Sequence, residues 1–267
     1  MASTIKLLSS NDPLLGRLRT LALRKPLDNC FLIADLTQLR NECTTAALIR
    51  DGRPVAAASF YRDLPFRTIA LVAEEADDAR AVVGKLVEAH PELAEVPVYD
   101  FYPKRIAGLL RECFPVAGVM IEYQMILRGA IPDVTIDSRY NIRRLTPVDL
   151  PAISRLFELA PAMAWTPRAF GFGPFFGAFR DSELVSIAGV HYAIPEIAEI
   201  GNIVTHPEHR GQNLAYACTR LVAEILRNFS QIVFLCVKAD NVKALDLYSR
   251  MGFAVYQELE MVEYRIQ

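Results

Sequence analysis

The sequence lacks the features that would place it in a specialised class of protein. It has no low-complexity tract, 22% of its 267 residues are charged, and its formal net charge is −2. A charge so close to zero gives no reason to expect a nucleic acid or an anionic membrane surface as a partner. No apolar run reaches the roughly 18 to 20 residues that a helix needs to span a bilayer, so we expect no membrane partner either.

The N-terminus also lacks the marks of a targeting signal. The segment from Met1 to Arg24 has a basic, amphipathic character but no compact apolar stretch and no small-residue cleavage site. We therefore expect this segment to form a helix of the folded protein, and we expect the compartment to be the cytoplasm.

Disulfides and metal sites find little support in the composition. The five cysteines are odd in number and contain no Cys-x-x-Cys pair, which favours buried reduced thiols over a disulfide framework or a zinc knuckle. His206 and His209 lie close in the sequence, but Pro207 disfavours a helix between them and no third ligand follows nearby. We predict no metal site.

The sequence does contain an internal repeat. ALIRDGRPVAAAS, which begins at Ala47, matches GAFRDSELVSIAG, which begins at Gly177. Each segment reads as a strand, a charged turn that starts at Arg-Asp, and a second strand rich in small residues. The repeat therefore predicts the same β-hairpin in both halves of the chain.

A second pair of matching segments closes each half. Met120–Tyr123 reads MIEY and Met261–Tyr264 reads MVEY. Two matches in the same order indicate a tandem duplication. They predict one domain at 1–130 and another at 138–267, joined by a polar link.

The second half reads as a domain of mixed α/β (α+β) class, with helices around one mixed central sheet. An antiparallel hairpin forms the front of this sheet. A buried apolar strand between two helices supplies a strand–helix–strand unit behind it. The predicted strands are 140–144, 175–180, 184–193, 199–205, 232–237 and a final region from 254, and the predicted helices are one ending near 160, 214–229 and 242–251.

The first half predicts similar elements but differs at one helix start. Where the second half has Arg210-Gly-Gln, the first has the acidic run Glu74-Glu-Ala-Asp-Asp. Acidic residues suit a helix N-terminus but repel a phosphate, so this half is expected to share the fold without the usual cofactor site. Its predicted helices are 14–23, 29–36, 77–89 and 103–113, and its strands are the hairpin 47–59, 67–72, 96–101 and one ending at 127.

The segment from Asn202 to Ala215 reads as a strand, a short loop and a helix start. A helix N-terminus offers about four unpaired N–H groups and a partial positive charge. Gly211 lets the backbone approach a pyrophosphate closely, and Arg210 adds a charge. An ordinary loop whose helix is capped by Asn213 explains the same pattern, so this segment alone leaves both interpretations open.

A second constellation follows the apolar strand at 232–237. Asn241 is a natural helix cap, and the spacing puts Asn241, Ala244 and Tyr248 on one face of the next helix. A cap amide, a small residue and a phenol can form a wall for an extended thiol cofactor. The alternative is an amphipathic helix with a tyrosine at its edge.

Together the two segments resemble the acyl-CoA-binding motifs of the GNAT acetyltransferases. The resemblance covers about 140–267, and its nearest branch includes the glycine N-acyltransferase-like domains. Asn213 stands where the family usually has a glycine, but asparagine is the non-glycine residue best suited to a left-handed conformation. The segment RGQNLA at 210–215 is similar to the Q/R-x-x-G-x-G/A loop, and NVKALDLYSRMGF at 241–253 is similar to the second motif.

The resemblance implies a fold of two tandem GNAT-like domains and acetyl-CoA as the co-substrate. Backbone groups of the strand would pair with the pantetheine arm, the loop would hold the pyrophosphate, and Asn241 would bind the cofactor from the opposite side. Tyr248 would protonate the leaving thiolate. The implied cofactor-binding residues are Ile203, Val204, Thr205, Arg210, Gly211, Gln212, Asn213, Leu214, Ala215, Asn241, Ala244 and Tyr248.

The acceptor amine must lose a proton before it attacks the thioester, and a carboxylate usually takes that proton, directly or through water. Glu199 begins the strand that carries the cofactor-binding residues. Strand alternation places its side chain on one face with Gly201, Ile203 and Thr205. The alternative is a solvated glutamate at a strand end. The lesser candidates are His191, which is equally well a buried core histidine, Tyr192 and Glu196.

No diagnostic motif identifies the acceptor. The aromatic stretch 165–179 either walls an apolar pocket or packs in the core, and core packing explains it better. We predict an N-acetyltransferase that moves an acetyl group from acetyl-CoA to a primary amine of a small molecule or a peptide. Two alternatives stay open: a longer acyl-CoA as donor, and a non-enzymatic CoA-binding or assembly module. The oligomeric state also stays open, a homodimer included.

Overall fold

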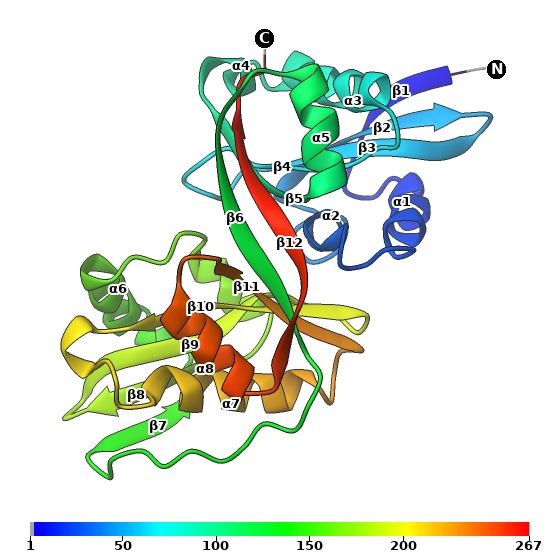
Figure 1. The fold of residues 1–267 in the computed structure, drawn as a ribbon. Coiled ribbons are helices and arrows are strands. Elements are labelled where there is room, and N and C mark those ends of the chain that lie inside the picture. Colours follow the sequence, from blue (N-terminus) through cyan, green and yellow to red (C-terminus); the bar gives the residue numbers. More distant parts are fainter. Residues whose placement is uncertain (1–2, 267) are drawn as a thin grey trace. The chain divides into compact units, whose positions relative to one another are not determined.

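The structure, a computed structural model, describes residues 3–266, and its helices and strands fall into two units (Figure 1). The first unit contains the chain up to Glu122 together with the segment from Glu258 onward, and the second contains Tyr123–Gln257. Each unit is a sheet flanked by helices, as the sequence predicts for an α/β fold. The predicted division at 1–130 and 138–267 differs from the observed one, because the C-terminal segment lies with the first unit.

Two long strands account for this difference. β6 (Val116–Leu127) and β12 (Phe253–Tyr264) each contribute residues to both units. In the first unit, the end of β12 pairs antiparallel with β5 (Val98–Pro103). The matching MIEY and MVEY segments lie in these two strands. The end of β6, from Tyr123, belongs to the second unit, and the end of β12, from Glu258, belongs to the first. Each half of the sequence therefore supplies a strand segment to the unit built mainly from the other half.

The first unit contains a four-stranded sheet in the order β1-β2-β3-β4, in which neighbouring strands are antiparallel. The prediction of a helix at the very N-terminus is wrong for β1, because pairing with β2 from Ser3 to Leu8 decides its conformation. The elements are β1 (Ser3–Leu8), α1 (Leu14–Ala22), α2 (Cys30–Asp35), β2 (Cys43–Arg50), β3 (Arg53–Tyr61), β4 (Ile69–Val72), α3 (Ala76–Ala89), α4 (Glu92–Glu95), β5 and α5 (Lys104–Cys113).

The second unit contains the strand order β11-β10-β9-β8-β7, with β10 and β11 parallel and the other pairs antiparallel. Short 3-10 helices occur at η1 (Pro147–Asp149), η2 (Pro167–Gly171) and η3 (Pro207–His209). The other elements are β7 (Tyr140–Arg144), α6 (Leu150–Leu159), β8 (Phe176–Arg180), β9 (Glu183–Ala193), β10 (Ile197–Thr205), α7 (Leu214–Leu226), β11 (Ile232–Lys238) and α8 (Val242–Arg250).

The repeated hairpin has the same turn in both units. Asp51 and Gly52 have φ values of 48° and 74°, and Asp181 and Ser182 have φ values of 48° and 77°. Two central residues with positive φ are typical of the type I′ turn, whose twist matches that of the flanking strands. The predicted repeat is therefore confirmed at the level of the backbone.

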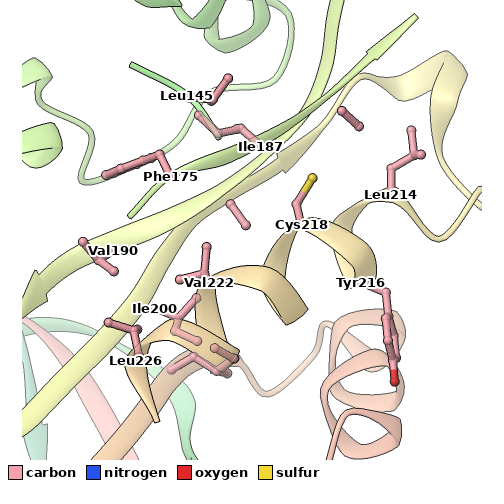
Figure 2. Close-up of a cluster of buried hydrophobic side chains, with 14 of the residues drawn as sticks. Leu145, Phe175, Ile187, Val190, Ile200, Leu214, Tyr216, Cys218, Val222 and Leu226 are labelled. Carbon is pink, nitrogen blue, oxygen red and sulfur yellow. The ribbon is translucent and has the colours of Figure 1, made fainter. Parts of the chain in front are cut away.

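The α7 helix covers one face of the second sheet. Its residues Cys218, Val222 and Leu226 are buried in a hydrophobic cluster with Ile187 and Ile200 of the sheet (Figure 2). The apolar spacing of the sequence predicts a buried face that includes Cys218 and Val222, and this part is correct. Ile225 and Phe229 of the same predicted face are exposed, and the helix ends at Leu226 rather than at 229. No helix within residues 3–266 has the length and apolar character required to cross a membrane.

Two buried aspartates, Asp100 of β5 and Asp35 of α2, lie in the first unit. Asp100 is 4% exposed and accepts hydrogen bonds from the Ile69 amide (2.7 Å), from the Tyr102 hydroxyl (3.0 Å) and from the Tyr264 hydroxyl of β12 (3.2 Å). Burial raises the pKa of Asp100 to about 7 and that of Asp35 to about 8, because the charged form loses its hydration.

These two pKa values predict how the stability of the first unit depends on pH. The unfolded chain ionises both groups near the ordinary value of 3.8, whereas the folded chain holds the protons up to about 7 and 8. Their contribution to the unfolding free energy is therefore complete below about pH 4 and is lost as the pH rises through the folded-state values.

In urea unfolding followed by circular dichroism, we expect the first-unit midpoint to fall between about pH 4 and pH 8. The double variant D35N/D100N should lose most of this slope, and D77N at an exposed site should keep it. Fluorescence of Trp165, the one tryptophan of the chain, identifies the transition of the second unit. An unchanged slope in the double variant would contradict the assignment.

Candidate active site

The two parallel strands of the second unit separate soon after they begin. β10 and β11 pair only from Ile197↔Ile232 to Glu199↔Phe234, although β10 continues to Thr205 and β11 to Lys238. Beyond Glu199, the edge of β10 that faces β11 therefore has backbone groups without a strand partner. Such groups are strong donors and acceptors, and an extended ligand can pair with them like an added strand.

A β-bulge interrupts β10 in the same region. The register of β10 against β9 shifts between Gly201 and Val204, and Asn202 has a left-handed φ of 53°. A bulge adds one residue to its strand and reverses the alternation beyond it. The predicted shared face of Glu199 with Ile203 and Thr205 is therefore wrong, and Val204 takes that position.

Asn202 is a site residue that the sequence reasoning missed. Its side chain is 6% exposed, and its amide group donates to the Val190 carbonyl at 3.2 Å. Its Oδ1 atom is buried and accepts no hydrogen bond within residues 3–266. An unsatisfied buried acceptor costs about 1 to 3 kcal/mol, and the available signal was an asparagine inside an apolar strand.

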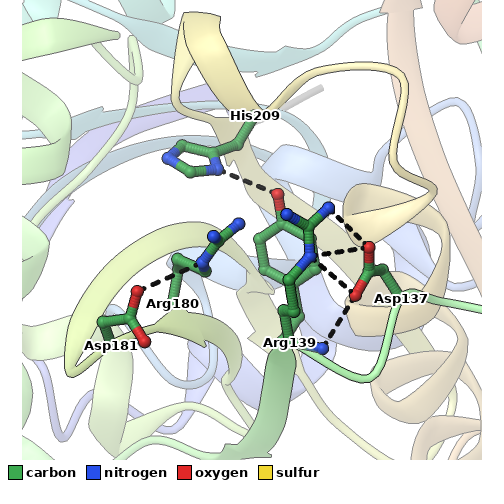
Figure 3. Close-up of polar contacts among 6 residues, drawn as sticks. Asp137, Arg139, Arg180, Asp181 and His209 are labelled. Carbon is green, nitrogen blue, oxygen red and sulfur yellow. Dashed lines mark hydrogen bonds and ion pairs between the residues drawn. The ribbon is translucent and has the colours of Figure 1, made fainter.

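The loop after β10 is held by local polar contacts. The His206 ring accepts a hydrogen bond from the Glu208 amide at 3.2 Å, and the Arg210 Nε donates to the Thr205 carbonyl at 3.3 Å. His209 Nδ1 lies 3.0 Å from the hydroxyl of Tyr140, which fixes η3 against β7 (Figure 3). Across residues 3–266, no group of three or more His, Cys, Asp or Glu is arranged to hold a metal ion.

The start of α7 has free backbone donors. Gly211 and Asn213 have φ values of 78° and 59°, so the left-handed conformation expected of Asn213 is confirmed. The Asn213 side chain makes no cap hydrogen bond, so the interpretation as an ordinary capped loop is wrong. Within the described chain, the N–H groups from Gln212 to Ala215 donate to no acceptor. Together with the helix dipole, they form a site for an anion.

The α8 helix begins at Val242 as predicted and ends at Arg250, one residue before its predicted end. The Asn241 side chain accepts a hydrogen bond from the Ala244 amide at 3.2 Å, which confirms its role as N-cap. Tyr248 is 8% exposed, and its ring lies edge-on to Phe253 with centroids 6.2 Å apart. Burial raises the pKa of Tyr248 well above its usual value, so the phenol keeps its proton at neutral pH.

Tyr248 lies in the same hydrophobic cluster as Ile203, Val204 and Ala244. Its hydroxyl group makes no hydrogen bond with any residue from 3 to 266.

The predicted site residues differ in their exposure to solvent. Three of them are buried: Glu199, Leu214 and Tyr248. Five are half-buried: Ile203, Val204, Thr205, Ala215 and Ala244. The exposed ones are Arg210, Gly211, Gln212, Asn213 and Asn241.

Glu199 lies inside the sheet rather than in solvent. It is 3% exposed and pairs in register with Tyr192 of β9 and Phe234 of β11, whose ring centroids are 6.4 Å apart. Its Oε1 atom lies 3.2 Å from Nδ1 of His191, whose side chain is 31% exposed. The alternatives of a solvated glutamate and of a fully buried histidine are therefore both wrong.

The aromatic stretch before β8 packs in the core. Phe175 is 1% exposed, and the Trp165 ring lies edge-on to Phe157, Phe170 and Phe175. The prediction that core packing explains this stretch is confirmed for Phe175.

Comparison with known proteins bears on the fold and on one segment of the sequence. No curated protein matches the chain. A tandem GNAT protein from the clavulanic acid biosynthesis pathway has 18% identity and a TM-score of 0.70, over 98% of each chain. A Drosophila protein has 15% identity and a TM-score of 0.73, over 98% of this chain and 99% of that one. An acetyltransferase-like protein of the GNAT family from Novosphingobium aromaticivorans has 22% identity and a TM-score of 0.58, over 76% and 85%.

At these identities the structural likeness shows the fold alone, and the fold is that of a protein with two tandem GNAT domains. The second half also shows a likeness in sequence. Residues 142–253 match the model of the Acetyltransferase (GNAT) family. The match begins in β7 and ends at the start of β12, and it includes the separated strands, the loop before α7 and the whole of α8.

The left-handed conformation of Asn213 can be tested by substitution. We expect N213A to lower the unfolding free energy of the second unit by about 1 kcal/mol, because alanine tolerates this conformation poorly. N213G, the matched control, should be at least as stable as the parent. Urea unfolding followed by Trp165 fluorescence measures both, and equal stability of N213A and N213G would contradict the assignment.

Proposed function

We propose that the protein is an acyl-CoA-dependent N-acyltransferase that acts through its second unit, with acetyl-CoA as the donor. One observation supports this most strongly: the unpaired edge of β10 leads directly to the uncapped N-terminus of α7. A backbone edge suits a ligand with amide groups along an extended chain, and a helix N-terminus suits a phosphate. Coenzyme A has both groups in this order.

The donor is proposed to lie along β10. The amides of its pantetheine arm pair with the backbone of Ile203, Val204 and Thr205, on the edge that β11 leaves open. The pyrophosphate lies at the loop, where Arg210 adds a positive charge and Gly211 presents no side chain. The remaining N–H donors come from Gln212, Asn213, Leu214 and Ala215. Asn241 and Ala244 of α8 form the opposite wall.

The chemistry is proposed to occur where β10 and β11 separate. The amine nitrogen attacks the thioester carbonyl, the new C–N bond forms, and the C–S bond breaks. The proton of the amine passes to the pair formed by Glu199 and His191, which are 3.2 Å apart. The leaving thiolate takes a proton from Tyr248, whose phenol is neutral and makes no other hydrogen bond within residues 3–266.

The first unit is proposed to bind no CoA at the equivalent position. Its α3 helix carries Asp77 and Asp78 in the first turn, where α7 has no acidic residue. Arg50 donates to Asp78 at 2.9 Å, so the carboxylate of the protein itself occupies this helix start. A phosphate would meet two negative charges there.

The finer choices rest on the resemblance. The glycine N-acyltransferase-like branch and a primary amine of a small molecule or peptide stay predictions. A thiol-release assay over a panel of amines, after titration calorimetry with acetyl-CoA, tests the activity. Binding without turnover across the panel would favour a CoA-binding module, and turnover with longer acyl-CoA alone would change the donor.

We expect R210E to weaken acetyl-CoA binding by about 100-fold or more. A charge-assisted hydrogen bond contributes about 1.5 to 3 kcal/mol, and the new carboxylate repels the phosphate. Titration calorimetry measures the dissociation constant. R227E, at the exposed C-terminal end of the same helix, is the control and should bind normally. Unchanged affinity in R210E would remove the phosphate-loop assignment.

We expect Y248F to lower kcat by about 10²- to 10⁴-fold, the usual contribution of a general acid. The dissociation constant of acetyl-CoA should change much less, because the ring and its packing remain. Y256F, at a residue that is 47% exposed, serves as the control. A Y248F enzyme with the parental kcat would show that another group protonates the thiolate.

A further inference from the structure

His191 occupies an irregular position in β9. Glu199 pairs with Tyr192 and the next residue, Ile200, pairs with Val190, so His191 is the extra residue of a β-bulge. A second bulge lies on β10 at Asn202. Bulges redirect side chains and are common beside active sites. The two bulges lie on either side of Gly201, next to the point where β10 and β11 separate.

Gly201 allows the His191 ring to lie against the backbone of β10. A Cβ atom at position 201 would be 2.4 Å from Nε2 of His191 and 2.5 Å from Cε1. Both distances are far shorter than a van der Waals contact, so any side chain at this position would displace the ring. The absence of a side chain at Gly201 therefore leaves room for the imidazole against the backbone of β10.

Glu199 and His191 differ in their access to a substrate. The Glu199 carboxylate is 4% exposed between two aromatic residues, while the His191 side chain is 31% exposed. The contact of 3.2 Å joins Glu199 to Nδ1 of the ring. A ring that donates its Nδ1 proton to a carboxylate keeps Nε2 as the acceptor nitrogen.

The other ionisable groups on elements packed against β9 are directed elsewhere. The ionisable side chains of α6 and η2 are exposed, and two ionisable residues of α7 pair with each other at 2.9 Å. Tyr192 lies beside Glu199 in the register of the two strands. The exposed residues are Arg155, Glu158 and Arg168, and the paired residues of α7 are Arg220 and Glu224.

We propose that His191 is the catalytic base of the acyl transfer and that Glu199 and Gly201 are its positioning residues. This inference rests on the proposed function. Nε2 of His191 takes the proton as the amine nitrogen bonds to the thioester carbon, and the resulting imidazolium is stabilised by the Glu199 carboxylate. The ring then releases this proton to solvent. A buried carboxylate that orients a histidine in this way performs the same task as the aspartate of a Ser-His-Asp triad.

The test compares H191Q, E199Q and G201A in the full-length protein, with acetyl-CoA and an amine that the parent accepts. H191Q should lower kcat about 100-fold or more and abolish the acidic limb of the kcat/KM profile. E199Q should retain activity at high pH, with the acidic limb moved to lower pH, because the imidazolium loses its stabilising charge. G201A should resemble H191Q. H90Q, in the first unit, should behave as the parent.

Two readouts separate this inference from the proposed function. In titration calorimetry, acetyl-CoA should bind H191Q and E199Q with the affinity of the parent. If the parent itself showed no binding or no turnover, that result would count against the proposed function. NMR titration of the four histidines needs no turnover. The resonance missing in H191Q should titrate at lower pH in E199Q, and the His90 resonance should not move.

Contrary results are equally clear. A parental rate and pH profile in H191Q would overturn the proposal. An E199Q enzyme that is inactive at every pH, beside an H191Q enzyme that keeps its acidic limb, would assign the base to Glu199. An unchanged His191 titration in E199Q would show that the two side chains are not coupled.

Discussion

The second unit depends on the separation of β10 from β11. Parallel pairing ends at Glu199 and Phe234, and from there the sheet can no longer satisfy the backbone of β10 on that edge. The same strand leads into α7, where the N–H groups from Gln212 to Ala215 also have no acceptor in the described chain. An open strand edge and an open helix start are each costly when left unsatisfied. They follow each other in the sequence, and the proposed binding of an extended ligand that ends in a phosphate rests on this order.

The separation also determines where acid–base groups can lie. Before it, Glu199 is enclosed by pairing on both sides and loses contact with water. At the separation, the bulges at His191 and Asn202 change the direction of the side chains, and Gly201 leaves room for a ring. A buried carboxylate and a half-exposed imidazole thus lie 3.2 Å apart. In a regular pair of strands, the partner of Ile200 would point to the face opposite Glu199, because neighbouring residues alternate.

The sequence predicts most helices and strands of both units because their patterns are local. The apolar spacing of α7, the Asn241 cap and the Arg-Asp turns each act over a few residues, and the structure contains all three. Features that depend on a distant partner were missed. β1 is a strand because β2 pairs with it, and the bulges arise from the fit of β10 to β9. The MIEY and MVEY segments showed the repeat, but no local pattern reveals that the end of β12 pairs with β5.

The strands that the two units share tie the first unit to the rest of the chain. In the first unit, β5 pairs along its whole length with the last strand of the sequence, β12. Tyr264 is fully buried there and donates to Asp100, so the end of the chain is tied to the core of the first unit. Because β12 begins in the second unit and ends in the first, neither half of the sequence contains all the strands of its own domain. A cut between the two halves of the sequence would therefore remove a strand segment from each unit, because β6 and β12 each contribute residues to both.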